Sequence, residues 1–207
     1  MTEVKLCGLS RIQDIEAANI IKPDYVGFVF AQKSRRYVSP ETAKILKNKL
    51  NPDIKAVGVF VNEDIQNIAL IAQLGIIDLI QLHGSENEEY IQKLRAVTDK
   101  PIIQAFVIKN AKDVRLAEKS CADFILLDGG KGEGKAFSRD FLTSIKRPYF
   151  LAGGLDTENI AEAVRHFHPY AADVSTGVET DGKKDKNKMT AFVNAVRKEN
   201  QYDKSKR

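Results

Sequence analysis

The chain has 207 residues, and its 43% hydrophobic and 29% charged content is that of a globular domain. Two cysteines are too few for a disulfide framework, so we expect both to be free thiols. The N-terminal segment lacks the basic and apolar regions of a secretory signal, and no apolar run approaches the roughly 20 residues of a membrane span. We therefore expect a cytoplasmic protein with no membrane partner.

The net charge of +4 is concentrated toward the C-terminus. Residues 197–207 hold five basic and two acidic side chains, a net +3, and residues 179–188 hold four basic and three acidic ones, a net +1. Because the rest of the chain is balanced, we expect no nucleic-acid partner. We expect one domain over residues 1–207, in which residues 199–207 form a mobile C-terminal end.

Eight short apolar runs recur along the chain, with helical patterns between them. The runs are residues 4–7, 25–30, 54–61, 79–82, 102–107, 124–127, 149–152 and 171–174. Such runs are typical of parallel strands covered on both faces, and eight units predict an α/β fold with one closed (βα)8 barrel, a TIM barrel. The alternative, an open doubly wound sheet, would carry a glycine-rich nucleotide fingerprint after its first strand, which residues 7–11 (CGLSR) lack.

Aspartates precede or open every second predicted strand: Asp24, Asp78, Asp123 and Asp173. Polar residues at strand starts form the N-terminal rim of a barrel, where they contribute to stability. We therefore expect all four to be structural.

Functional groups of such a barrel lie at the C-terminal ends of its strands. The reactive or polar side chains at those positions are Cys7, Arg35, Arg36, Gln81, His83, Gln104 and Asp128. Cys7 and Asp128 could face each other as a base and an acid, and His83 competes for such a role. Without other ligand types at suitable spacing, His83 is interpreted as a wall residue rather than a metal ligand. One of the two arginines could pair with a substrate carboxylate, or both belong to a solvated loop.

Two loops near the C-terminus suggest a phosphate site. Gly153 and Gly154 follow the seventh predicted strand, and Ser175, Thr176 and Gly177 follow the eighth. Barrels often bind phosphate there through backbone amides, although tight turns would use the same glycines. Residues 129–136 (GGKGEGKA) match a P-loop except at the last position, where alanine replaces the hydroxyl that holds magnesium, so we interpret them as a glycine-rich loop.

Short stretches at the strand ends stand in the same order as in a known enzyme family. They are residues 4–9 (VKLCGL), 27–30 (GFVF), 34–39 (SRRYVS), 57–62 (VGVFVN), 81–84 (QLHG), 126–128 (LLD), 151–155 (LAGGL), 173–179 (DVSTGVE) and 182–185 (GKKD). Together they cover nearly the whole chain and resemble the phosphoribosylanthranilate isomerases of tryptophan biosynthesis.

The resemblance implies an Amadori rearrangement of N-(5-phosphoribosyl)anthranilate to 1-(2-carboxyphenylamino)-1-deoxyribulose 5-phosphate, with neither cofactor nor metal. Cys7 matches the general base of the family and Asp128 its general acid. Arg36 matches the arginine that receives the anthranilate carboxylate. The other substrate contacts are expected from Gln81, His83, Gly153, Gly154, Ser175, Thr176 and Gly177.

This chemistry needs a thiolate and a carboxylic acid in one pocket. We therefore expect the pKa of Cys7 to be lowered from about 8.5 and the pKa of Asp128 to be raised from about 3.9. The chain departs from the family in residues 131–137, a shortened loop, and at Ser138, where aspartate is more common. The competing interpretations are the analogous isomerase of histidine biosynthesis, which uses two aspartates, and a non-catalytic sugar-phosphate sensor. The sequence leaves open a monomer or a homodimer.

Overall fold

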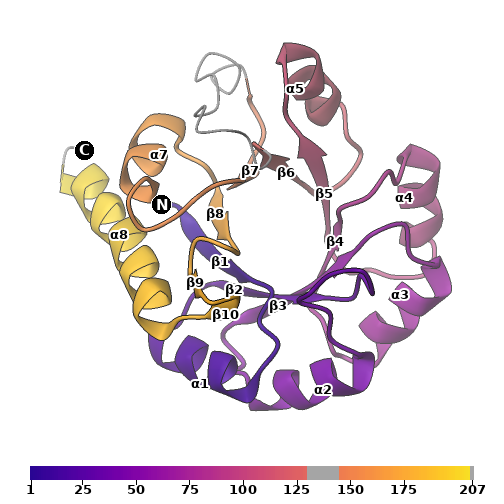
Figure 1. Cartoon of the computed structure of the whole chain (residues 1–207). Coiled ribbons are helices and arrows are strands. Elements are labelled where there is room, and N and C mark those ends of the chain that lie inside the picture. Colours follow the sequence, from indigo (N-terminus) through magenta and orange to yellow (C-terminus); the bar gives the residue numbers. More distant parts are fainter. Residues whose placement is uncertain (130–144, 206–207) are drawn as a thin grey trace.

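The computed structural model describes residues 1–129 and 145–205, and its centre is a closed barrel of eight parallel strands (Figure 1). The strands are β1 (Glu3–Cys7), β2 (Tyr25–Val29), β3 (Lys55–Phe60), β4 (Leu79–Leu82), β5 (Ile102–Val107), β6 (Phe124–Asp128), β7 (Tyr149–Ala152) and β8 (Ala171–Val174). Each strand pairs with the next, and β8 pairs with β1 to close the sheet. The predicted (βα)8 barrel is confirmed.

Helices surround the barrel and cover its outer face (Figure 1). They are α1 (Ile12–Ile21), α2 (Pro40–Lys49), α3 (Ile65–Gln73), α4 (Glu88–Arg95), α5 (Ala111–Glu118), α7 (Ile160–Phe167) and α8 (Lys186–Ser205). Several begin at polar residues whose side chains accept a backbone N–H of the first turn, as Ser39, Asp64 and Asn87 do. No helix of the described residues is long and apolar enough to cross a membrane.

Aromatic side chains fill the barrel interior at the N-terminal ends of the strands. Near the strand starts, Tyr25, Phe124, Phe150 and Tyr170 pack ring against ring with centroids 5.2 to 5.8 Å apart. These rings close the N-terminal end of the barrel with apolar surface. The cavity described below lies at the other end of the barrel, at the C-terminal ends of the strands.

Three of the four strand-start aspartates are structural, as expected. The carboxylates of Asp24, Asp78 and Asp123 accept backbone N–H groups at the starts of β1, β3 and β5, at 2.7 to 2.8 Å. Asp173 differs because β8 already begins at Ala171, which places this side chain well inside the barrel. The rim position expected for Asp173 is therefore wrong, although its ion pair with Lys5, described with the site, is still a structural contact.

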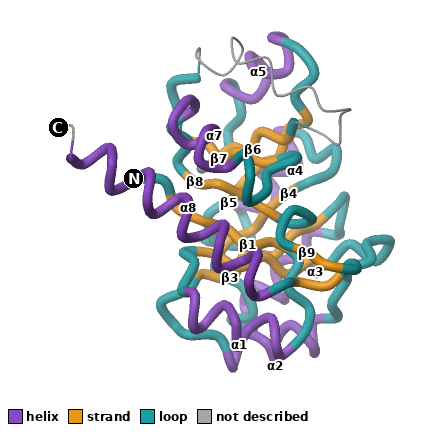
Figure 2. Tube along the Cα trace, turned by 60° about the vertical axis from the view of Figure 1, so that its left-hand side comes forward, coloured by secondary structure: helices purple, strands orange, loops and turns teal. Residues whose placement is uncertain are grey.

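The last helix ties the two ends of the chain together. Met189, Phe192, Val193 and Val196 of α8 are buried, and Asn200 exchanges two hydrogen bonds of 2.7 and 2.8 Å with the backbone of Thr2. Figure 2 shows the final turns of α8 projecting away from the barrel. Residues 199–205 thus continue this helix, and the mobility expected for this end stays a prediction.

Candidate active site

A cavity of about 790 Å³ opens at the C-terminal ends of the strands. All ten residues that the sequence analysis assigns to catalysis or substrate binding line this one cavity: Cys7, Arg36, Gln81, His83, Asp128, Gly153, Gly154, Ser175, Thr176 and Gly177. Gln104, another strand-end candidate, is instead used structurally, because its amide bonds the Glu86 carbonyl and the Ser120 hydroxyl. The barrel topology brings these distant positions together.

Cys7 ends β1 and is partly exposed to the cavity. Its neighbour in the register is Gly27 of β2, and a Cβ atom at Gly27 would lie 2.7 Å from the Cys7 Sγ atom. That distance is too short for real atoms, so a glycine is required beside the thiol. The space for the Cys7 side chain is therefore provided by the adjacent strand.

A buried ion pair lies directly below Cys7. Lys5 precedes Cys7 by two positions on β1, so both side chains point to the interior. The Lys5 side chain is 0% exposed, and its Nζ atom lies 2.9 Å from Asp173 Oδ2. The other carboxylate oxygen of Asp173 is buried and has no hydrogen-bond partner among the described residues. The sequence analysis did not predict this pair. The signal that could have indicated it is a lysine within an apolar strand, two positions before Cys7 and therefore on the same face of the strand.

The structure changes the expectation for the Cys7 thiol. Burial raises its pKa, and the carboxylate of Asp173 raises it further, whereas the cations of Lys5 and Lys184 lower it. The net result is a pKa above the ordinary value, so the expected lowering of the Cys7 pKa is wrong. The reason is that the desolvation of a thiolate outweighs two nearby ammonium groups.

Replacing Lys5 by methionine should lower the free energy of unfolding by about 3–5 kcal/mol, because Asp173 would keep a buried, unpaired charge. The measurement is urea-induced unfolding of both proteins at neutral pH. The double variant Lys5→Met/Asp173→Leu is the control, and it should recover most of the loss. A loss of less than about 1 kcal/mol in the single variant, the range of a surface pair, would contradict this prediction.

On the opposite wall, Gln81, His83 and Asp128 form a row. The amide nitrogen of Gln81 lies 2.8 Å from His83 Nδ1, and His83 Nε2 lies 3.6 Å from Asp128 Oδ2. A Gln81 amide that donates to Nδ1 leaves the proton of the neutral ring on Nε2, which faces the carboxylate. The row thus orients His83 toward Asp128, the strand-end carboxylate expected to act as acid.

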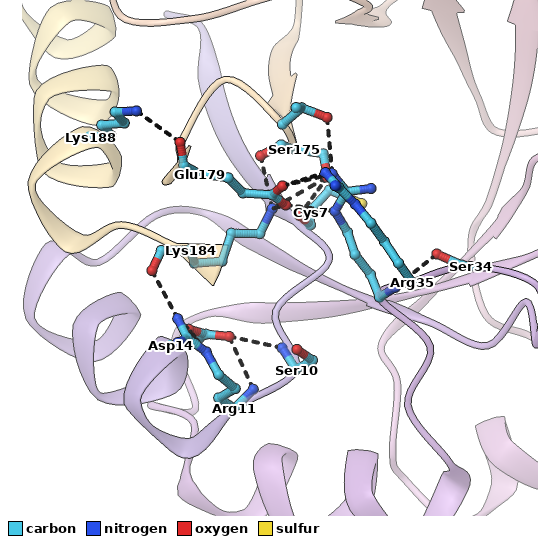
Figure 3. A network of polar contacts seen from close by, with 12 residues as sticks. Cys7, Ser10, Arg11, Asp14, Ser34, Arg35, Ser175, Glu179, Lys184 and Lys188 are labelled. Atoms are coloured by element: carbon cyan, nitrogen blue, oxygen red, sulfur yellow. Dashed lines mark hydrogen bonds and ion pairs between the residues drawn. The ribbon is translucent and has the colours of Figure 1, made fainter. Parts of the chain in front are cut away.

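Arg36 projects over the first strand from the loop after β2. Its Nε and Nη2 atoms lie 2.6 and 3.0 Å from the two carboxylate oxygens of Glu179, and Nη2 also donates to the Thr176 hydroxyl. A side chain at Gly8 would collide with Arg36, so Gly8 makes room for it. Arg35 also pairs with Glu179 (Figure 3). Its side chain is exposed and is not among the residues that line the cavity. The structure therefore favours Arg36 of the two arginines.

The two glycine-containing loops meet beside the cavity. Gly153 and Gly154 have φ values of +92° and +66°, and Gly154 has open space around its missing side chain. Gly177 instead packs against the carbonyl of Leu155, so its glycine is needed for close contact between the loops. After the second loop, β9 (Glu179–Thr180) and β10 (Lys183–Lys184) form a short hairpin that the sequence analysis did not predict. Most of the glycine-rich segment 129–136 lies outside the described residues.

Comparison with known proteins gives one consistent result. Residues 4–195 match the family model described as N-(5'phosphoribosyl)anthranilate (PRA) isomerase. The N-(5'-phosphoribosyl)anthranilate isomerase of Endomicrobium trichonymphae is 45% identical over 202 residues, which cover 95% of this chain and 99% of that protein.

Solved structures agree with the sequence relatives. The phosphoribosyl anthranilate isomerase of Thermotoga maritima has a TM-score of 0.88 and 35% identity, covering 96% of this chain and all of that one. A phosphoribosyl anthranilate isomerase in complex with reduced 1-(o-carboxyphenylamino)-1-deoxyribulose 5-phosphate has a TM-score of 0.86 at 34% identity, with the same coverage. Monomers generated from the dimeric T. maritima isomerase have a TM-score of 0.82 at 35% identity, covering 95% and 99%. The chain belongs to the family of N-(5'-phosphoribosyl)anthranilate isomerases.

Proposed function

We propose that this chain converts N-(5'-phosphoribosyl)anthranilate to 1-(2-carboxyphenylamino)-1-deoxyribulose 5-phosphate by general acid and base catalysis, with Asp128 as the acid and Cys7 as the base. The observation that carries the proposal is the placement of both groups on one cavity, at the ends of β6 and β1. The family of the chain supports the reaction, and a solved relative holds a reduced form of this product.

In the first step, protonated Asp128 donates its proton to the ribose ring oxygen. The bond between C1 and that oxygen breaks, and the amine lone pair forms a protonated imine at C1. Gly153 packs against Asp128 so closely that a Cβ atom there would lie 2.5 Å from Oδ1. This packing and the facing His83 ring fix the direction in which the acid points.

In the second step, the thiolate of Cys7 removes the proton from C2, and the electrons of the C–H bond neutralise the imine to give an enolamine. Tautomerisation of the enolamine then produces the ketone at C2. Lys5 and Lys184 each lower the pKa of Cys7, so they stabilise the thiolate that this step consumes. Gly153, Gly154, Ser175, Thr176 and Gly177 would bind the phosphate, while Gln81 and His83 would contact the reacting part of the sugar.

The alkaline limb of the pH profile of kcat/KM should report Cys7. The rate follows the product of the thiolate fraction of Cys7 and the acid fraction of Asp128, and between their two pKa values these fractions change in opposite directions and cancel. Above the pKa of Cys7 the thiolate fraction stops rising, so the rate falls. Since burial raises that pKa, the fall should begin above about 8.5, the value of an ordinary thiol. A steady-state profile from pH 7 to 10.5 checks this, and a fall centred well below 8.5 would contradict it.

The direct test is to add the purified protein to N-(5'-phosphoribosyl)anthranilate and follow the loss of its anthranilate-type fluorescence. A rate above the uncatalysed background supports the isomerase, and a rate equal to background would support the alternative, a sugar-phosphate sensor. The histidine-type isomerase is disfavoured because a thiol, not a second aspartate, stands at the end of β1.

For the protein as a whole, we propose a single domain over residues 1–207 that works in the cytoplasm as a monomer or a homodimer. Its partner is a small phosphorylated substrate, and no nucleic acid, metal or cofactor takes part. The dimeric T. maritima relative supports a homodimer as one of the two states.

A further inference from the structure

Glu179 lies at the centre of a cluster of cations beside the cavity. Its side chain is only 4% exposed, and its carboxylate oxygens lie 2.7 Å from Arg35 Nη2, 2.6 Å from Arg36 Nε and 2.7 Å from Lys184 Nζ. Figure 3 shows Lys184 and Arg35 reaching Glu179 from different elements. Three cations surround one carboxylate, so the cluster keeps a net charge of +2 and can accept a further anion.

The pairing with Glu179 fixes the plane of the Arg36 guanidinium. Nε and Nη2 of Arg36 bind the two oxygens of the carboxylate in a forked arrangement, which restricts both the position and the rotation of the group. The remaining nitrogen, Nη1, makes no hydrogen bond to any described residue, and Arg36 lines the cavity. One edge of Arg36 is held by the protein, and the other is available to a ligand.

Glu179 is itself held from several sides. Lys188 donates to its backbone carbonyl at 2.8 Å, and Lys184 donates both to its carboxylate and to the carbonyl of Ser175. The Ser175 hydroxyl in turn donates to the carbonyl of Cys7 at 3.1 Å. Although burial opposes ionisation, Arg36 and Lys184 hold the pKa of Glu179 below its usual value. The carboxylate is thus charged and immobilised before any ligand enters.

We propose that Glu179 is a positioning residue that orients Arg36 to receive the aromatic carboxylate of the substrate, and so determines the preference of the enzyme for a carboxylated ring. This inference rests on the proposed function, in which Arg36 binds that carboxylate. The net positive charge of the cluster does not by itself give a preference for a carboxylated ring, because it also attracts the phosphate that every ligand of the site carries. The same holds for an arginine that is not held in one orientation.

The test compares two ligands by isothermal titration calorimetry. One is reduced 1-(o-carboxyphenylamino)-1-deoxyribulose 5-phosphate, and the other is the same compound without its carboxyl group. The Kd of the ligand without the carboxyl group divided by the Kd of the ligand with it measures the contribution of the carboxylate to binding. For the wild type we expect this ratio to be about 10 to 100, as for hydrogen bonds between charged groups. In Glu179→Gln the ratio should fall below about 3, because one arm of the glutamine amide is an NH2 donor and cannot accept the second N–H group of the Arg36 fork.

Two further variants complete the experiment. Glu89→Gln removes the same charge from an exposed pair with Lys93 on α4 and should keep the wild-type ratio. In Arg36→Met the ratio of Kd values should also fall below about 3, as in Glu179→Gln. Unchanged affinity of Glu179→Gln for the ligand without the carboxyl group shows that its pocket is intact. If Glu179→Gln does not bind that ligand, Glu179→Asp takes its place in the experiment. Its shorter side chain reaches Arg36 less well, so we expect a reduced ratio of Kd values in this variant too.

The outcomes separate the two proposals. The role of Glu179 alone is overturned if Arg36→Met loses the ratio of Kd values while Glu179→Gln keeps the wild-type ratio. If Glu179→Asp has to replace Glu179→Gln, the same outcome in that variant overturns it. A wild-type ratio in Arg36→Met overturns the role of Arg36 and with it the inference. Absence of turnover by the wild type in the fluorescence assay, together with the expected ratios, overturns the proposed reaction and leaves the carboxylate preference standing.

Discussion

Replacing Cys7 by alanine should lower kcat by about 10²- to 10⁴-fold, the contribution of a well-placed general base. The thiol lies at the end of β1, above the buried pair of Lys5 and Asp173, and it lines the cavity in which the proposed reaction needs a base for the C2 proton. Ligand affinity should change little, because Cys7 is not among the groups proposed to bind the phosphate or the carboxylate. The measurement is steady-state turnover combined with Kd for the reduced product.

Cys121 provides a matched control for that variant. It is exposed and precedes β6, at the opposite end of the barrel from the cavity, so Cys121→Ala should keep the wild-type kcat. A kcat for Cys7→Ala within about threefold of the wild type would exclude a general-base role, since base catalysis contributes far more.

Replacing Asp128 by asparagine should also lower kcat by about 10²- to 10⁴-fold, because an amide has the size of the acid but cannot protonate the ring oxygen. Ring opening would then depend on water, and the later proton removal at C2 could not begin. In single-turnover experiments the variant should bind the substrate and release it unchanged. Rapid mixing followed by fluorescence separates binding from the loss of the anthranilate signal.

Asp53→Asn is the control for the loss of a carboxylate, because Asp53 is exposed before β3 on the far side of the barrel. If Asp128→Asn kept near wild-type turnover, His83 would be the remaining candidate acid, since its Nε2 atom faces the same space. The double variant Asp128→Asn/His83→Ala would then be inactive, and its loss of turnover relative to Asp128→Asn would assign the proton transfer to His83.

The fold could be predicted because its signals are local and repeated. Each apolar run became a strand with bounds within one residue of those predicted, since a strand covered on both faces must be apolar throughout. The ten site residues could be placed on one cavity because the strand ends of a barrel share one face. The topology thus brings residues from six separate strand ends together around one cavity.

The parts that were missed depend on contacts between distant segments. The sequence predicts a rim position for Asp173 by analogy with Asp24, and only the register of β8 against β1 shows that it meets Lys5. The hairpin of β9 and β10 has two residues in each strand, too few for a periodic pattern. The pKa of Cys7 was mispredicted because desolvation, which outweighs the lysines, depends on burial in the finished barrel.

The closure of the barrel by β1 and β8 also has a consequence for the synthesis of the protein. Lys5 meets Asp173 and Cys7 meets Ser175, and each pair is separated by 168 positions along the chain. During translation, which proceeds from the N-terminus, the first strand emerges with its lysine and thiol long before either partner exists. The ammonium of Lys5 must therefore stay hydrated until β8 has been made, and we expect burial of this side chain to be among the last events of folding.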